Sequence, residues 1–460
     1  MDTRTRQVEQ IHPATPGLLT VYACGPTVYR YAHVGNLRTF LLSDLIRRTA
    51  EQSGLRVQLI QNITDVRHLQ DDSAVDAEGE DKLLAQAKAE NKDPFAIARF
   101  YEDAFHADLA LLNVRPADAY PRASEWIDSM IRLIRALVDK GHAYEQDGSV
   151  YFDARSFPSY GAISGNRLED LRAGHGATGE STAEGKRFHA DWALWKSAGA
   201  QRAMTWDSPW GFGFPGWHTE CSAMSVELLG ETIDVHTGGI DLRFPHHEDE
   251  RAQSDSAVGH EVVTHWVHGE HLLFEGRKMA KSTGNVVLVS DVVERGHDAL
   301  ALRLAFLQTR YRQQANLSWE AIAGADKLLT RWRSLVADWA ESPSKPMCAD
   351  YSAELREAFE DDLDTPRAVQ VLRRLEKEEL PDGSKLETFL WVDHYLGLDL
   401  ARDIGKPKAT LPAEAQALLD QRAKARDDKD FAGSDRLRDE LAALGVLVKD
   451  TKSGQEWSLA

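Results

Sequence analysis

Residues 33–36, with the sequence His-Val-Gly-Asn, are of types that can hold a nucleoside triphosphate. They lie between a short apolar stretch and a helical pattern, where backbone amides and the helix dipole favour a bound phosphate. Gly35 would let a planar base approach the backbone. His33 and Asn36 are the candidate side chains for orienting a phosphoryl centre. Alone these residues are a weak signal, because an ordinary glycine turn with a hydrogen-bonded histidine has the same pattern.

A second segment, residues 278–282, has the sequence Lys-Met-Ala-Lys-Ser. Its lysines, Lys278 and Lys281, are three residues apart and could bind a pyrophosphate and neutralise the charge of its departure. A solvated cluster of loop charges is the simpler alternative. Because the two segments reinforce each other, they predict a nucleotide site built from His33, Gly35, Asn36, Lys278, Met279, Lys281 and Ser282.

Four further residues could coordinate a metal ion. Cys24 and Cys221 offer thiolates, while His246 and Glu250 are four residues apart, on one face of a helix. Two thiolates, one imidazole and one carboxylate make a reasonable zinc set. Spacing alone does not establish it, because there is no C-x-x-C pair, the residues are widely separated, and other ligand types compete, namely His247, Glu248 and Asp249. The alternative is two buried free cysteines beside a solvated acidic helix.

Cations gather near the end of the chain. Two helical segments carry Arg422, Lys424, Arg426, Lys429, Arg436 and Arg438, and these are followed by Lys449, Lys452 and Trp457. A basic surface with an exposed aromatic ring suits the splayed bases of single-stranded RNA. Three aspartates interrupt it, so a solvated helical face fits the composition nearly as well. The segment 310–312, Arg-Tyr-Arg, is a second candidate RNA contact.

Composition limits the class of protein. With 460 residues, about three domains are expected. Lysine and arginine number 54 against 73 aspartates and glutamates, and the net charge of −19 excludes a globally basic nucleic-acid binder but not local basic patches. The three cysteines, Cys24, Cys221 and Cys348, fit a reducing cytoplasm better than a disulfide framework. We expect no signal peptide and no membrane span.

The elements that must position these residues begin as an α/β unit. A strand is predicted at 18–23, a helix at 37–52 and a second strand at 57–61, an order typical of the start of an α/β domain. The next predicted elements are helices at 82–112 and 125–140, a hairpin strand at 149–153 and a Gly-, Ser- and Thr-rich loop at 154–186.

The second half of the chain begins with a helix at 219–229 and strands at 233–236 and 286–289. From Asp291 to about Leu396 the pattern is mostly helical. A linker at 404–408 precedes a helical pair, 412–429 and 433–444, then a strand at 446–448 and a last strand that holds Trp457.

Several phrases, in order, carry a close resemblance to a known enzyme family. They are YACGPTVYRYAHVGNLRTF, NITDV, DWALWK, PGWHTECSAM, IDVHTGGIDLRFPHHEDERAQS and KMAKSTGNVV. Residues 33–36 and 278–282 resemble the signature loops of class I aminoacyl-tRNA synthetases, usually written HIGH and KMSKS, with Asn36 for the second His and Ala280 for the middle Ser. The phrases together, and the tail, resemble the cysteinyl-tRNA synthetase family.

The resemblance implies an α/β fold class. A Rossmann-like class I catalytic domain with a parallel sheet would be followed by a helical domain and a small C-terminal α+β module. The implied divisions are the first catalytic half at 1–120, a connective insertion at 121–200, the second catalytic half with the KMAKS loop at 201–290, a stem-contact region at 291–340, a helical bundle at 341–403 and an anticodon-binding module at 409–460.

The resemblance also implies the chemistry. Members of the family activate L-cysteine with ATP and Mg²⁺ and pass it from cysteinyl-adenylate to the 3′ end of tRNA(Cys). In that family an active-site zinc ion, one per chain, binds the substrate's sulfur, and the ligands carried over here are Cys24, Cys221, His246 and Glu250. The implied cysteine pocket is lined by Thr27, Thr64, Trp217 and Asp241. Asp241 would hold the α-ammonium group, and Trp217 would pack over the side chain.

A metal makes this pocket physically sensible. An ordinary pocket discriminates poorly between serine and cysteine, whereas zinc binds thiolate well and a neutral hydroxyl weakly. Selectivity would then need no editing domain, and no second hydrolytic domain is evident. The implied tRNA contacts are Arg310, Arg312, Arg436, Arg438, Lys449 and Trp457. We expect a monomer.

Some positions depart from the family pattern. Arg30 stands where Asp is common, Arg67 and His68 replace an acidic pair, and the helical region 365–396 looks shortened. A diverged copy therefore stays open, either a cysteine ligase of mycothiol biosynthesis, which acts on an amino sugar, or a non-catalytic tRNA-binding protein. The tail through Trp457 argues against the first, and the intact lysines and metal set argue against the second.

Overall fold

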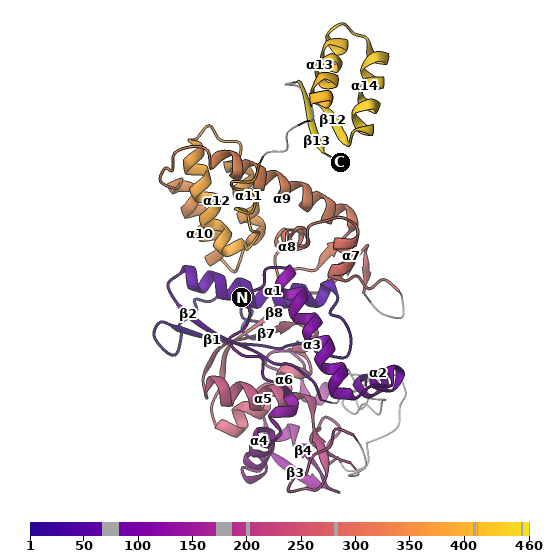
Figure 1. Ribbon diagram of the computed structural model, residues 1–460. Helices are drawn as coiled ribbons and strands as arrows, with labels where there is room; N and C mark the ends of the chain where they lie inside the picture. Colours follow the sequence, from indigo (N-terminus) through magenta and orange to yellow (C-terminus); the bar gives the residue numbers. More distant parts are fainter. Residues whose placement is uncertain are drawn as a thin grey trace. The chain divides into compact units, whose positions relative to one another are not determined.

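The computed structural model describes residues 1–66, 82–171, 186–198, 203–279, 284–407, 411, 413–451 and 454–459. The chain divides into two compact units, 1–402 and 403–460 (Figure 1). No helix among the described residues is both long and apolar enough to cross a bilayer. The α/β fold class is confirmed, because a parallel sheet with helices forms the core of the first unit.

The central sheet has the order β2-β1-β7-β8, and its neighbouring strands are all parallel. The strands are β1 (Leu18–Ala23), β2 (Arg56–Gln61), β7 (Ile233–Gly239) and β8 (Val263–Gly269). From β1 the chain passes through α1 (Val34–Gln52) to β2 on one side, while β7 and β8 lie on the other. Ligands of open parallel sheets bind at the carboxyl ends of the strands, where the order reverses in this way.

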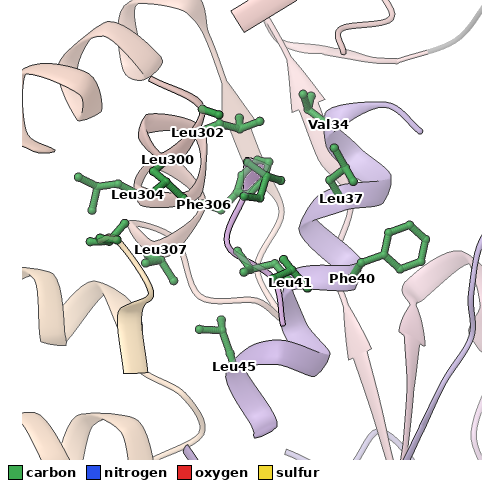
Figure 2. Close-up of a cluster of buried hydrophobic side chains, with 14 of the residues drawn as sticks. Val34, Leu37, Phe40, Leu41, Leu45, Leu300, Leu302, Leu304, Phe306 and Leu307 are labelled. Carbon is green, nitrogen blue, oxygen red and sulfur yellow. The ribbon is translucent and has the colours of Figure 1, made fainter. Parts of the chain in front are cut away.

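Helix α1 joins the sheet to the helical part of the unit. Its buried side chains Leu37, Leu41 and Leu45 recur at helical spacing. Figure 2 shows these side chains beside those of α8 (Ala299–Leu307), which belongs to the same apolar core. Burial of one such leucine contributes roughly 1.5–3 kcal/mol, so this contact holds the start of α1 in place.

The helix predicted at 82–112 is two helices, α2 (Lys82–Glu90) and α3 (Pro94–Leu111). Asn91 has a positive φ of 51°, which ends α2. The Asp93 side chain then accepts a hydrogen bond from the Ala96 amide, and Pro94 fills the first turn of α3. The break therefore has a local cause in the sequence.

An antiparallel sheet precedes the second half of the central sheet. Its order is β3-β4-β5-β6, from β3 (Ala143–Gln146), β4 (Ser149–Phe152), β5 (Trp192–Ser197) and β6 (Gly213–Pro215). It follows helix α4 (Ile127–Asp139). Of the predicted 154–186 loop, the described residues hold only two 3₁₀ turns, and residues 172–185 lie outside the described part. Strand β6 leads directly into α5 (Trp217–Leu229), which packs against α6 (His246–Val258).

The strand predicted at 286–289 is wrong. Val289 instead begins helix α7 (Val289–Glu294), whose start is stabilised because the Asp291 carboxylate accepts a hydrogen bond from the Leu288 amide. A three-stranded sheet, β10-β9-β11, lies around this region, formed by β10 (Arg277–Lys278), β9 (Leu272–Phe274) and β11 (Ala315–Leu317). The predicted helical region is confirmed as α8, α9 (Trp319–Trp339), α10 (Ala349–Glu360), α11 (Thr365–Leu375) and α12 (Asp382–Leu396).

The second unit is small. A helical pair, α13 (Ala413–Asp427) and α14 (Phe431–Ala443), is followed by the antiparallel strands β12 (Val446–Thr451) and β13 (Gly454–Leu459). Its buried apolar core consists of Ala415, Leu419, Leu441 and Val446. The predicted α+β module and the position of Trp457 on its last strand are confirmed.

Candidate metal centre and active site

The four predicted metal ligands meet at the carboxyl edge of the central sheet. Cys24 follows β1 directly, Cys221 lies on α5, and His246 and Glu250 lie on the first turns of α6. Their ligand atoms all lie within 4.8 Å of one another, and all four residues are buried. The two Sγ atoms are 3.9 Å apart, and His246 Nε2 is 2.9 Å from Glu250 Oε1. Widely separated parts of the sequence thus form one cluster.

Burial shifts three of these four groups toward their neutral, protonated forms. Burial raises the pKa of Cys24 well above its ordinary value and that of Glu250 to about 7. At Cys221 the bond with Cys24 lowers the pKa, but burial and the carboxylate of Glu250 outweigh it and raise the pKa to about 11. A divalent cation would hold these groups ionised. The S₂NO donor set and its size therefore fit a metal ion of the zinc type.

Two further histidines surround Cys24. His236 Nε2 lies 3.4 Å and His247 Nε2 lies 3.2 Å from the Cys24 sulfur, and both could join a ligand set with Glu250. Burial lowers the pKa of His236 to about 4, so its ring is neutral at pH 7. The sequence considered His247 only as a competitor and gave His236 no role. The signal for His236 was its place on β7, the strand that pairs with β1.

A cavity of about 220 Å³ opens beside Cys24. Three of the four predicted cysteine-pocket residues line it, namely Thr27, Trp217 and Asp241. The Trp217 ring centroid lies 4.1 Å from that of His246, so the tryptophan connects the cavity to the cluster of candidate metal ligands. The cavity is thus small, partly aromatic and bordered by one carboxylate.

The fourth predicted pocket residue, Thr64, is not among the described residues that line this cavity. Thr64 is 2% exposed, and its hydroxyl donates a hydrogen bond to Glu220 Oε2 at 3.0 Å. Burial raises the pKa of Glu220 well above its ordinary value. Sequence reasoning missed Glu220, because its place beside Cys221 on α5 does not indicate that it faces inward.

The loop at residues 33–36 contains a neutral histidine. His33 caps α1: its Nδ1 accepts a hydrogen bond from the Asn36 amide at 3.2 Å, and Asn36 Oδ1 accepts one from the His33 amide at 3.2 Å. Burial and the nearby Arg30 lower the pKa of His33 to about 4. The ring is therefore neutral at pH 7, and its proton lies on Nε2 because Nδ1 is an acceptor. His33 Nε2 and the side-chain Nδ2 of Asn36 remain as hydrogen-bond donors for a ligand.

The second loop lies against the first. A Cβ atom on Gly35 would come within 2.8 Å of Met279 Cε, so only glycine fits there without a shift of the methionine. The Val34 amide donates to the Val287 carbonyl at 2.9 Å, which ties α1 to the segment after the loop. Lys278 is exposed and does not line the cavity. Lys281 and Ser282 lie outside the described residues.

The two predicted RNA contacts near residue 310 are ion-paired. Arg310 pairs with Asp364, and Arg312 Nε lies 2.6 Å from Asp362 Oδ2. Both arginines keep part of their side chains exposed, 25% and 32% respectively. Their charge is therefore partly compensated within the protein.

In the second unit the predicted basic surface is smaller than expected. Arg422 is only 1% exposed and forms an ion pair with Asp450 at 2.9 Å, so its assignment to this surface is wrong. The guanidinium is turned inward, where it donates hydrogen bonds to Asp450 and Gln455. Of the other eight predicted residues, Lys452 lies outside the described residues and the remaining seven are exposed, namely Lys424, Arg426, Lys429, Arg436, Arg438, Lys449 and Trp457. Two of them are near a carboxylate: Arg426 pairs with Asp450 at 2.9 Å, and Arg438 lies 3.4 Å from Asp435.

Two family models match the chain. The model described as tRNA synthetases class I (C) catalytic domain matches residues 10–327, and the model described as cysteinyl-tRNA ligase anticodon binding domain matches residues 408–457. A cysteine–tRNA ligase of Thermus thermophilus is 42% identical, with 100% of this chain and 98% of that protein covered. That of Deinococcus radiodurans is 39% identical, with 99% and 95% covered.

Solved structures agree on the fold. A Mycobacterium tuberculosis methionyl-tRNA synthetase with methionyl-adenylate aligns with a TM-score of 0.52 at 16% identity, covering 91% of this chain and 96% of its own. A LeuRS of Agrobacterium radiobacter K84 aligns with a TM-score of 0.59 at 12% identity, covering 84% of each chain. At such identities the likeness concerns the fold alone.

Proposed function

The chain belongs to the cysteinyl-tRNA synthetase family, and from this premise we propose how its own residues perform the reaction. The protein is a ligase that activates L-cysteine with ATP and transfers it to the 3′ end of tRNA(Cys). One observation supports the roles given to the residues: a cluster of four potential metal ligands lies beside a small cavity. The four are Cys24, Cys221, His246 and Glu250.

The cysteine substrate occupies the cavity of about 220 Å³. Asp241 accepts hydrogen bonds from the α-ammonium group, and Trp217 packs over the short side chain. Zinc held by Cys24, Cys221, His246 and Glu250 supplies, when bound, a Lewis acid that prefers a thiolate to a neutral hydroxyl. This preference accounts for selectivity against serine, which an ordinary pocket discriminates poorly.

Activation requires the cysteine carboxylate to attack the α-phosphate of ATP, which enters with Mg²⁺ as part of the substrate. His33 Nε2 and the side-chain Nδ2 of Asn36 donate hydrogen bonds to the phosphoryl oxygens at the start of α1. Lys278 and Lys281 neutralise the pyrophosphate as it leaves. Because the residues act by positioning and electrostatics, no general base is needed in this step.

Transfer follows when the terminal ribose hydroxyl of the tRNA attacks the mixed anhydride and AMP leaves. We propose that Arg310 and Arg312 bind the tRNA backbone near the acceptor stem. Arg436, Arg438, Lys449 and Trp457 bind the anticodon region, where a stacked base and paired phosphates suit this residue set.

Neither alternative function gains support. A cysteine ligase acting on an amino sugar has no use for the anticodon-binding module matched at 408–457. A non-catalytic tRNA-binding protein has no need for four buried ligand atoms within 4.8 Å of one another. We therefore retain the synthetase reaction alone. We also propose that the protein acts as a monomer in the cytoplasm.

One experiment tests the proposed function in two steps. Cysteine-dependent exchange of pyrophosphate into ATP measures activation, and transfer of labelled cysteine to tRNA(Cys) and to glucosaminyl-inositol measures the acceptor. We expect exchange, and transfer to tRNA only. Absence of exchange would contradict the proposal, and so would transfer to the sugar alone.

A further inference from the structure

Three aromatic rings from two distant segments gather beside the cavity, and two of them line it. Tyr31 lies in the loop before α1, while Phe100 and Tyr101 lie on α3. The centroids of Tyr31 and Tyr101 are 5.2 Å apart, those of Phe100 and Tyr101 are 5.1 Å apart, and the rings meet edge to face. Tyr31 and Phe100 also meet edge to face, at 6.1 Å. We name these three residues the aromatic rim.

The rim extends from the cavity into solvent. Tyr101 is 8% exposed and belongs to the apolar core, so it anchors the other two rings. Tyr31 is 43% and Phe100 is 50% exposed. Tyr31 and Tyr101 line the cavity, whereas Phe100 lies one ring further out. Single exposed aromatic rings are ordinary, but adjacent ones at the edge of a cavity mark a binding surface.

Positive charge accompanies the rim. Arg30 precedes Tyr31, lines the same cavity and is exposed. Its guanidinium lies 5.2 Å from the Tyr29 ring centroid, and no carboxylate among the described residues pairs with it. Lys92 lies 5.7 Å from the Phe100 ring but is paired with Glu90 at 2.8 Å. Arg30 therefore supplies the uncompensated charge beside the rings.

Exposed aromatic rings beside an unpaired arginine are the combination that binds single-stranded nucleic acid, because bases stack on the rings and phosphates pair with the cation. The proposed transfer step needs such a ligand at this place. The terminal ribose must reach the cavity, and the unpaired nucleotides before it must lie on the surface that borders the cavity. That border includes Tyr31 and Arg30.

Resting on the proposed function, we propose that the aromatic rim and Arg30 bind the unpaired 3′ nucleotides of the tRNA. One base stacks on Tyr31 and a second base stacks on Phe100, and Arg30 pairs with the phosphate that precedes the terminal nucleoside. The rim thereby guides the terminal ribose to the cavity. This assigns a function to Arg30, which departs from the usual family residue.

The test compares two forms of tRNA(Cys), one intact and one lacking its unpaired 3′ nucleotides. Equilibrium binding is measured for the wild type, Tyr31→Ala, Phe100→Ala and Arg30→Gln. We expect each alanine variant to bind intact tRNA about 5- to 150-fold more weakly, the range for one lost stacking contact. The truncated tRNA should bind these variants and the wild type equally. Salt dependence is measured as the slope of the logarithm of the binding constant against the logarithm of the salt concentration. For intact tRNA, Arg30→Gln should make this slope shallower by about 0.7, the value for one single-strand phosphate.

Two controls separate stacking from folding. Leu111→Ala removes an exposed apolar side chain from the other end of α3 and should bind both tRNA forms as the wild type does. Tyr31→Phe and Phe100→Tyr retain the rings and should restore the affinity for intact tRNA. An equal loss on both tRNA forms would overturn the proposal.

The adenine ring of ATP is the rival occupant. A raised KM for ATP in pyrophosphate exchange, with tRNA affinity unaltered, would show that the rings hold adenine and would overturn the proposal. The proposed function fails separately, since it falls only if the wild type does not charge tRNA(Cys). If the wild type charges tRNA and the rim variants bind it normally, the rim assignment alone is wrong.

Discussion

At the scale of single residues, the site depends on buried groups that must lose a proton before they can bind a metal ion. Cys24, Cys221 and Glu250 are buried together, and burial favours their neutral forms. Without a cation both cysteines are thiols at pH 7, and Glu250, with a pKa of about 7, is about half protonated. A bound cation inverts this preference, so metal affinity and ligand ionisation are one property.

Replacing one thiol should therefore remove the metal. We predict that Cys221→Ser loses the metal ion and cysteine activation together, because a neutral hydroxyl is a weak zinc ligand. Elemental analysis and cysteine-dependent pyrophosphate exchange measure the two quantities. Cys348→Ser, which changes the half-buried cysteine outside the cluster, should keep both. A Cys221→Ser protein that retains one metal per chain would remove Cys221 from the ligand set.

The loop at residues 278–282 should affect the rate of cysteine activation and not the metal content of the protein. We predict that Lys278→Ala slows pyrophosphate exchange by about 10²–10³-fold, the usual cost of one donor to a developing charge. The metal content should not change. Lys345→Ala, at an exposed lysine of the helical region, should leave exchange intact. An unchanged exchange rate in Lys278→Ala would exclude this lysine from the reaction.

The role of a residue could be predicted when neighbouring residues in the sequence indicate it, and not when it depends on contacts made by the fold. The ligand set and the loops were recognised from ordered phrases, since spacing alone favoured two buried free cysteines beside a solvated acidic helix. His236 and Glu220 were missed because their roles depend on which strand or helix lies beside them. Arg422 was misassigned because a sequence does not show which cation of a helix is turned inward.

At the scale of elements, the position of α1 depends on a buried ion pair. Asp44 Oδ2 accepts hydrogen bonds from Arg303 Nη2 and Arg48 Nε, each at 2.7 Å. Arg303 also donates to the Leu112 carbonyl at 2.9 Å. Burial alone would raise the pKa of Asp44, but the two arginines outweigh it and hold this pKa below its usual value. The pair thus connects α1, which begins directly after His33, to α8.

Acid should loosen this connection. Since the pKa of Asp44 is depressed in the folded state, its stabilisation is full above the unfolded pKa of about 3.9 and is lost as pH falls through the folded pKa. We predict that Asp44→Asn lowers the free energy of unfolding by about 3–5 kcal/mol at pH 7, because Arg303 is left unpaired, and that this difference shrinks below pH 4.

Urea unfolding of both proteins at several pH values measures the difference. Asp399→Asn, which alters a surface pair with Arg402, should change stability by less than about 1 kcal/mol. Equal stability of Asp44→Asn and the wild type at pH 7 would contradict the role given to the ion pair.

The elements were largely predictable where periodicity was clear, as for β1, α1 and the C-terminal helical pair. Two failures have local causes. The break between α2 and α3 was signalled by Asn91, Asp93 and Pro94, which the helical pattern around them hid. The apolar run before Val289 resembles a strand, but Asp291 caps a helix there.

At the scale of the whole molecule, a net charge of −19 restricts where RNA can bind. An acidic protein repels nonspecific RNA, so affinity must come from local cations. Arg310 and Arg312 are partly compensated by Asp364 and Asp362. The exposed cations of the second unit are therefore expected to contribute much of the salt-dependent affinity.

We predict that the double variant Arg436→Gln, Arg438→Gln binds tRNA(Cys) more weakly. The slope of the logarithm of its binding constant against the logarithm of the salt concentration should be shallower by about 0.7–0.9 for each lost phosphate contact. Binding titrations at several salt concentrations measure both quantities. Cysteine-dependent pyrophosphate exchange, which does not use tRNA, should keep its rate. An unchanged salt dependence would exclude these two arginines from the tRNA surface.

The central proposal is a metal ion that coordinates the sulfur of the substrate and is held by Cys24, Cys221, His246 and Glu250. The most direct test is the absorption spectrum of the cobalt-substituted protein during addition of cysteine or serine. We predict thiolate-to-cobalt charge-transfer bands from the two protein cysteines, which intensify when cysteine adds a third thiolate and do not change with serine. A spectrum that cysteine leaves unchanged, in a protein that still activates cysteine, would contradict the claim.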